Sequence, residues 1–136
     1  MGFLAPYAEY VYAAFRIMTG LLMLQHGTQK LLGWFGGIPE GMMPAPMLYG
    51  LGSIELFGAL LVAVGLFAGP AAFLLSGTMA AAFAIGHAFN ADQNPTGSIV
   101  PLVNGGELAV AYCFAFLFIA AKGSGTWSVD AARGAK

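Results

Sequence analysis

Ionisable side chains within long apolar segments are the feature that most restricts how this chain can fold. Six of them lie inside or at the ends of such segments: Arg16, His26, Lys30, Glu55, His87 and Glu107. A charge near a bilayer centre costs about 2.5–3.5 kcal/mol on insertion scales, and such residues usually face a bundle interior and a partner. The sequence therefore predicts a polar site buried between helices.

The composition indicates an integral membrane protein. Hydrophobic residues make up 59% of the 136 residues and charged residues 8%, whereas about 25% are charged in a typical soluble domain. The mean hydropathy is +0.78. This length accommodates one domain, residues 1–136, with about four spans of roughly 20 residues. The net charge of −1 and the lack of a basic run exclude nucleic acid from the expected partners and leave the lipid bilayer.

The pattern of apolar segments predicts an all-α fold, a bundle of four transmembrane helices. The expected spans are residues 10–32, 47–67, 70–89 and 102–121, and residues 122–136 form a mobile tail. From Leu56 to Gly86 no residue is ionisable, and Gly69-Pro70 divides this stretch because proline suits the first turn of a new helix. One long kinked helix is the alternative.

The basic residues outside the spans predict the orientation. Lys122, Arg133 and Lys136 lie in the tail, whereas the first and third connections carry only Glu40 and Asp92. The positive-inside rule places the C-terminus in the cytoplasm, and four spans place the N-terminus there as well.

This topology gathers polar side chains in the outer half of the bundle. His26, Lys30, Glu55, His87 and Glu107 fall in that layer, with Asn104 close by on the fourth span. Because these residues cluster in one layer, a shared functional site is favoured over a separate structural role for each residue. Taken alone, Lys30 could serve merely to contact the lipid headgroups, and His87 could be an interfacial residue without a functional role.

The first span has a basic face. At about 100° per residue, Arg16, His26 and Lys30 occupy an arc of about 80°. Such a face should point inward toward Glu55 and Glu107. Arg16 lies roughly 15 Å deeper than His26, and we expect a structural ion pair between Arg16 and one of these glutamates.

A family resemblance follows from these residues. Arg16, Gly20 and the segment His26-Gly27-Thr28-Gln29-Lys30-Leu31-Leu32-Gly33-Trp34-Phe35-Gly36-Gly37 resemble the signature of the DoxX family of small bacterial membrane proteins, together with Glu55, Gly86-His87 and Glu107. The resemblance implies a four-helix bundle in the bacterial inner (plasma) membrane. Among its members is the membrane subunit of a thiosulfate:quinone oxidoreductase.

The first functional hypothesis is a quinone-linked membrane oxidoreductase, or its quinone-binding subunit. The candidate catalytic residues are His26, Lys30, Glu55, His87 and Glu107, and the candidate contacts to the quinone are His26, Lys30, Trp34, His87 and Asn104. No flavin, haem or iron–sulfur motif is visible, and no metal site is expected. Electrons would therefore come from another membrane or redox subunit, or from a small reductant.

Other classes of function use the same residues. A non-catalytic accessory or scaffold subunit of a larger membrane complex suits a small glycine-rich bundle without a redox cofactor motif. A pathway for a small solute or for protons would also need intramembrane acids and bases. Copper handling by Met42, Met43 and Met47 is a further possibility, because thioethers suit Cu(I).

Overall fold

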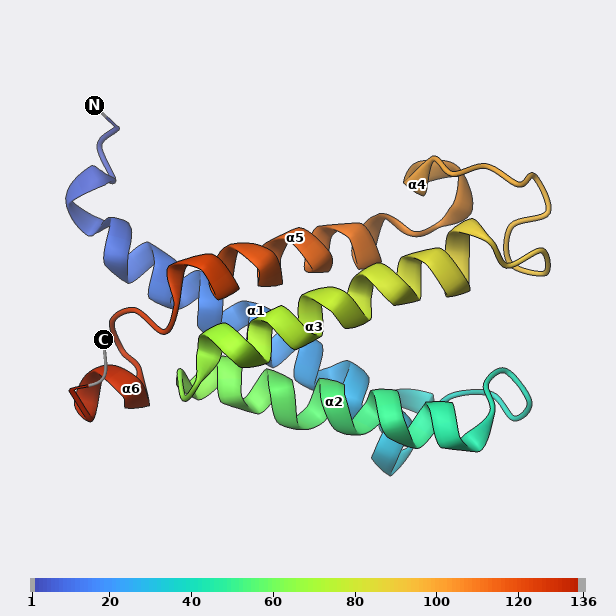
Figure 1. Ribbon diagram of the computed structural model, residues 1–136, viewed down its shortest axis with the longest axis horizontal. Helices are drawn as coiled ribbons and strands as arrows, with labels where there is room; N and C mark the ends of the chain where they lie inside the picture. Colours follow the sequence, from blue (N-terminus) through green and yellow to red (C-terminus); the bar gives the residue numbers. More distant parts are fainter. Residues whose placement is uncertain (1, 135–136) are drawn as a thin grey trace.

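The computed structural model describes residues 2–134, and over this range the chain is all-helical with no strand, which confirms the predicted class. The long helices are α1 (Ala8–Leu32), α2 (Ala45–Val64), α3 (Ala68–Ala82) and α5 (Glu107–Lys122), as Figure 1 shows. A π-helix, η3 (Phe83–Ala88), extends α3. The short helices are η1 (Ala5–Tyr7), η2 (Trp34–Gly36), α4 (Pro101–Asn104) and α6 (Val129–Ala132).

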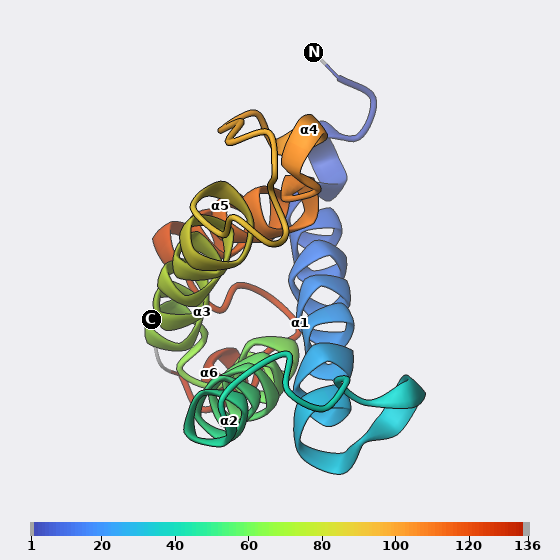
Figure 2. The ribbon, with the colours of Figure 1, turned by 90° about the vertical axis from the view of Figure 1, so that its right-hand side faces the viewer.

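The long helices form two pairs. α1 packs along α2, α3 packs along α5, and the contact between α2 and α3 joins the pairs (Figure 2). The Arg16 end of the molecule comprises the start of α1, the turn between α2 and α3, and residues 123–134. The Lys30 end comprises the end of α1, the start of α2, η3, α4 and the start of α5. The loops 33–44 and 89–100 both lie at the Lys30 end (Figure 1).

Glycines bring α1 and α2 into backbone contact. A Cβ atom on Gly27 would lie 2.5 Å from the backbone nitrogen of Leu56, and one on Gly20 would lie 2.8 Å from that of Ala63. From α2, Gly52 faces the side chains of Lys30 and Leu31, where a Cβ atom would lie 2.9 Å from the Lys30 Cβ. Small residues at helix interfaces permit this close approach. They also fix the register in which Lys30 meets α2.

The core lies where the two pairs meet. Met23, Val62, Leu75, Phe116 and Ile119 are fully buried and come from all four long helices. Cys113 lies beside this core, where its carbonyl oxygen accepts a hydrogen bond of 2.8 Å from the Ser76 hydroxyl. The environment agrees with a packing role for this cysteine.

By length and composition, two helices of the described chain are suited to cross a membrane. They are α2 (Ala45–Val64) and the continuous helix Ala68–Ala88 formed by α3 and η3. α1 is 25 residues long but carries Glu9, Arg16 and Lys30. α5 has 16 residues, about 24 Å at 1.5 Å per residue, which is shorter than a hydrocarbon core of about 30 Å.

The turn between α2 and α3 lies before the predicted Gly69-Pro70. Gly65 adopts a left-handed conformation with φ of 70° and ends α2, and Phe67 is also left-handed with φ of 48°. Hydrogen bonds from Gly65 and Leu66 to carbonyl oxygens of the last turn close this helix end. Pro70 lies within the first turn of α3, where proline is tolerated. The alternative of one long kinked helix is therefore wrong.

The predicted span 102–121 is interrupted. α4 ends at Asn104, Gly105 is left-handed with φ of 73°, and α5 begins only at Glu107. The side-chain oxygen of Asn104 accepts a hydrogen bond of 2.9 Å from the Gly106 N–H, which stabilises the break. Asn104 thus ends one helix instead of lying inside a continuous span.

The predicted mobile tail is folded over residues 123–134, and residues 135–136 lie outside the described part of the chain. Tyr12 donates a hydrogen bond to the Gly123 carbonyl oxygen. The Asp130 N–H donates to the Gly65 carbonyl oxygen at 3.0 Å. Ser128 caps α6 by accepting from the Ala131 N–H. These contacts place the segment after α5 against α1 and the α2–α3 turn.

Candidate functional site

A buried ion pair joins α1 to α2 at the Lys30 end. Lys30 Nζ lies 2.6 Å from Glu55 Oε2, and the side chains are 12% and 4% exposed, respectively. Gly27 and Gly52 flank this pair along the helix contact. A carboxylate buried this deeply requires a charged or hydrogen-bonding partner. The pairing therefore explains why Glu55 can lie within the apolar helix α2.

His26 lies one turn before Lys30 on α1 and faces α5. Its ring centroid is 6.0 Å from that of Tyr112, with the planes nearly perpendicular at 86°. The His26 ring is half-buried, and its nitrogens make no hydrogen bond within residues 2–134. Free ring nitrogens of a half-buried histidine can donate and accept hydrogen bonds with a ligand.

Tyr112 was not among the residues that the sequence predicted for the site. It stacks on the buried Phe116, with ring centroids 5.9 Å apart and an interplanar angle of 19°. This stacking holds its ring against His26. A tyrosine in an otherwise apolar segment was the available signal, because its hydroxyl needs a hydrogen-bonding partner when buried.

His87 and Asn104 come together in a network that is separate from the Lys30–Glu55 pair. Nδ1 of His87 donates to the Asn104 carbonyl oxygen at 3.2 Å, and the Asn104 amide donates to the Ser98 carbonyl oxygen at 3.1 Å. The Asn94 amide also donates to this oxygen and to that of Ala88. His87 lies in the π-helix η3, an irregularity often found at functional sites. The network ties η3 to α4 across the loop 89–100.

Glu107 and Trp34 lie at the surface. Glu107 is exposed in the first turn of α5. Trp34 is 56% exposed, and its ring lies edge-on to Phe35. Within the described range, no hydrogen bond or ion pair joins Trp34, His87, Asn104 or Glu107 to the Lys30–Glu55 pair. The residues predicted to form a single layer thus fall into two separate polar groups and two exposed residues. One group is Lys30–Glu55 with His26, and the other is His87 with Asn104.

Arg16 is fully buried at the Arg16 end and contacts backbone instead of a carboxylate. Nη1 donates to the carbonyl oxygens of Val62 at 2.6 Å and Ala63 at 2.8 Å. Nη2 donates to the carbonyl oxygens of Trp127 at 2.8 Å and Thr126 at 3.4 Å. Nε is buried without a partner in residues 2–134.

The predicted ion pair of Arg16 with Glu55 or Glu107 is therefore wrong. Glu55 binds Lys30, and the start of α5, where Glu107 lies, belongs to the opposite end of the bundle. The carbonyl groups at the C-terminus of α2 carry partial negative charge and compensate the guanidinium. Its planar fork of donors suits contacts to several oxygens at once.

The chemistry available at the Lys30 end is therefore that of His26, Lys30, Glu55 and Tyr112. Together they offer a cation, an anion, an imidazole and a phenol hydroxyl between α1, α2 and α5. Such a set can hydrogen-bond a polar headgroup and exchange protons with it. No group of three or more histidine, cysteine, aspartate or glutamate side chains converges on a metal-sized site in residues 2–134.

Comparison with known proteins identifies the family. The model of the DoxX family matches residues 11–88, which is more than half of the chain. The chain belongs to the DoxX family. This DoxX protein is 36% identical over 134 residues to a protein of Haemophilus influenzae described as "Uncharacterized protein", covering 96% of each chain. No solved structure matches.

Membership of the DoxX family and the apolar helices together indicate a membrane protein. The family match includes Arg16, His26, Lys30, Glu55 and His87, and it stops before α4 and α5. The Lys30–Glu55 pair and the Arg16 contacts with α2 therefore lie within the matched residues. Tyr112, Asn104 and Glu107 lie outside them.

Proposed function

We propose that this DoxX protein crosses the bacterial inner membrane four times, with both termini in the cytoplasm. The charges that lower the hydropathy of α1 are compensated inside the protein, since Arg16 binds carbonyl groups and Lys30 binds Glu55. α1 is about 37 Å long, sufficient for a span. Lys122 and Arg133 lie at the Arg16 end, which the positive-inside rule assigns to the cytoplasm.

Cysteine labelling tests this topology. Single cysteines at Gly36, the exposed Gln93 and Gly134, in a chain with Cys113 replaced by alanine, are expected to react from outside at the first two positions and from inside at the third. Labelling of Gly134 from outside would exclude the orientation.

We further propose that the Lys30 end binds a quinone headgroup as part of a membrane oxidoreductase. The observation that carries this proposal is the free, half-buried His26 ring beside the buried Lys30–Glu55 pair. A bound quinone accepts two electrons and two protons. His26 and Lys30 are suited to donate hydrogen bonds to its oxygens, while Glu55 holds the Lys30 ammonium in place and Tyr112 positions the imidazole. Electrons come from a partner redox subunit or from a small reductant.

The proposed headgroup site is limited to His26, Lys30, Glu55 and Tyr112. His87 donates its Nδ1 proton to Asn104, and this network supports the loop 89–100. Trp34 and Glu107 face the surroundings of the protein. In this proposal the ligand makes no contact with His87, Asn104, Trp34 or Glu107, which stabilise the Lys30 end.

Quinone titration in lipid nanodiscs tests the proposal. Ubiquinone and menaquinone analogues are added to the unmodified protein and to the variants His26→Ala and Glu55→Gln. We expect binding to the unmodified protein and at least tenfold weaker binding to both variants. Glu9→Gln is the matched control, because Glu9 forms an exposed ion pair with Lys122 at the other end. Equal binding by all four proteins would contradict the site.

A role as an accessory subunit of a larger membrane complex is the second candidate. It is favoured by the pairing of Lys30 with Glu55 and by the four hydrogen bonds of Arg16, which leave little charge available for a reaction. In that case the unmodified protein binds no quinone, and His26→Ala leaves assembly with partner subunits unchanged.

A further inference from the structure

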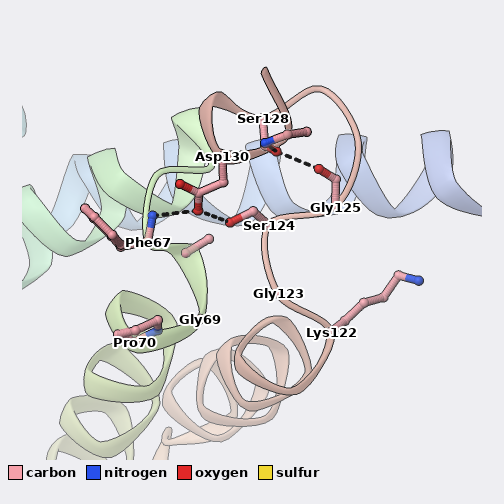
Figure 3. Close-up of a pocket in the computed structure, with 11 residues that line it drawn as sticks. Phe67, Gly69, Pro70, Lys122, Gly123, Ser124, Gly125, Ser128 and Asp130 are labelled. Atoms are coloured by element: carbon pink, nitrogen blue, oxygen red, sulfur yellow. Dashed lines mark hydrogen bonds between the residues drawn. The ribbon is translucent and has the colours of Figure 1, made fainter. Parts of the chain in front are cut away.

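The Arg16 end contains a pocket that the proposed quinone site does not use. It has a volume of about 530 Å³ and lies between the start of α3 and the segment after α5. Figure 3 shows Phe67, Gly69 and Pro70 on one side, and Ser124 and Asp130 on the other. The pocket thus combines an apolar wall with a polar one.

The polar wall is organised around the Asp130 carboxylate. Oδ2 accepts hydrogen bonds from the Phe67 N–H at 2.8 Å and from the Ser124 hydroxyl at 2.6 Å, both drawn in Figure 3. Within residues 2–134, Oδ1 makes no hydrogen bond. The protein therefore fixes this carboxylate through one oxygen and leaves the other available to a hydrogen-bond donor.

An apolar groove continues from this pocket. Gly69 and Pro70 line both, and the groove of about 480 Å³ runs between α3 and α5 past Phe73, Leu117 and Ala121. Phe73 and Leu117 are 68% and 43% exposed on this face. A polar pocket followed by an apolar groove matches a ligand with a polar head and an apolar chain.

The charges around the pocket indicate which class of polar headgroup fits it. The free oxygen of Asp130 attracts a cation and repels an anion. The Arg133 guanidinium is not part of the lining but lies 5.9 Å from the centroid of the Phe67 ring, which does line the pocket. Arg133 makes no ion pair within the described residues. Lys122 also lines the pocket, but its ammonium pairs with Glu9 at 2.7 Å. The unpaired carboxylate oxygen of Asp130, with the basic Arg133 nearby, suits a zwitterion whose ammonium enters and whose phosphate stays outside.

We propose that this pocket and groove bind a phospholipid with a primary amine, such as phosphatidylethanolamine. Its ammonium donates to Asp130, its phosphate lies near Arg133, and one acyl chain occupies the groove between α3 and α5. The proposal depends on the membrane location of the chain but is independent of the quinone site, which involves the opposite end.

Native mass spectrometry with defined lipids tests the proposal. The purified full-length protein in detergent is titrated with phosphatidylethanolamine, phosphatidylcholine and phosphatidylglycerol of identical acyl chains. We expect about fivefold tighter binding of the ethanolamine lipid, the scale of one partly exposed charged contact, because a quaternary ammonium has no N–H to donate. Equal binding of the three lipids, or preference for phosphatidylglycerol, would overturn the proposal.

Variants locate the site. Asp130→Asn should remove the preference for the ethanolamine lipid. Ala121→Trp should weaken the binding of all three lipids, because the indole would fill the groove. Ala111→Trp is the matched control, since Ala111 is exposed on the same helix outside the groove. Thermal unfolding checks that each variant is folded, and the lipid comparison on the unmodified protein stands if Asp130→Asn is unstable. Retention of the preference in folded Asp130→Asn, or equal effects of the two tryptophans, would contradict the site.

Discussion

The two ends of the bundle treat their buried polar groups differently. At the Arg16 end, one guanidinium donates hydrogen bonds to four carbonyl oxygens and is fully enclosed. At the Lys30 end, the Lys30–Glu55 pair lies beside His26, whose ring nitrogens make no hydrogen bond in residues 2–134. The guanidinium of Arg16, with only Nε unpaired within residues 2–134, holds two segments together. The His26 ring, with both nitrogens unpaired in the same range, has the capacity to bind a ligand.

The difference between the ends also explains where the segment after α5 lies. Arg16 binds carbonyl groups of Thr126 and Trp127, and Lys122 pairs with Glu9 at 2.7 Å. Tyr10 and Trp127 have ring centroids 5.3 Å apart. These contacts link α1 to the end of the chain. At the Lys30 end, His26 and Tyr112 provide the aromatic contact between α1 and α5.

Removing the guanidinium should produce the largest effect on stability. Arg16→Leu leaves the carbonyl groups of Ala63 and Trp127 without donors and removes one of the two donors to the Val62 carbonyl. We expect a loss of about 3–5 kcal/mol in the free energy of unfolding. Arg16→Lys should recover only part of it, because an ammonium cannot span the two segments. Unfolding by titration with a denaturing detergent measures both. Rescue of Arg16→Leu by Glu55→Gln would instead support the ion pair that the structure lacks.

Breaking the Lys30–Glu55 pair should have the next largest effect. Glu55→Gln leaves a buried ammonium without its counter-ion, and we expect a loss of about 2–3 kcal/mol because Lys30 retains some exposure. The double variant with Lys30→Met should recover at least 1 kcal/mol. Additive losses in this double-mutant cycle would show that the two side chains do not interact.

A methyl group between α1 and α2 should cost somewhat less. Gly27→Ala places a Cβ atom 2.5 Å from the Leu56 backbone nitrogen, so the helices must separate, and we expect a loss of about 1–3 kcal/mol. Gly50→Ala is the matched control on α2, since no atom lies within 4 Å of its Cβ position. Circular dichroism during thermal unfolding compares them. Equal unfolding temperatures would contradict the close backbone contact.

The smallest expected effect concerns the segment after α5. Ser124→Ala removes the hydroxyl that donates to Asp130 at 2.6 Å, and we expect a loss of about 1 kcal/mol. Ser53→Ala is the control, because the Ser53 hydroxyl makes no hydrogen bond in residues 2–134. Proteolysis after residue 122 reports on this segment. A similar cleavage rate in both variants would argue against the anchoring role of Asp130.

The sequence allowed the helices to be predicted better than their ends. Apolar length located α1, α2 and α3 within a few residues of the observed bounds. The turn at Gly65 was missed because Gly69-Pro70 is the stronger signal locally, although Pro70 fits within the first turn of a helix. Gly105-Gly106 was read as part of a span because glycine is common in membrane helices.

The polar partners were the hardest feature to predict. Angular position placed Arg16, His26 and Lys30 on one face, but the partner of Glu55 depends on the register that Gly27 and Gly52 impose. Arg16 binds backbone carbonyl groups, which every residue possesses and which leave no pattern in a sequence. The folding of segment 123–134 was also missed, because its small residues are typical of mobile tails.

Photolabelling with an azido-quinone in nanodiscs tests most directly the claim that the two ends have different roles. Our account predicts labelled peptides containing residues 26–30, 52–56 or 112, with labelling reduced by excess quinone and by His26→Ala. Peptides covering residues 62–70 and 123–130 should remain unlabelled. Labelling concentrated at the Arg16 end, or labelling that His26→Ala leaves unchanged, would contradict the account.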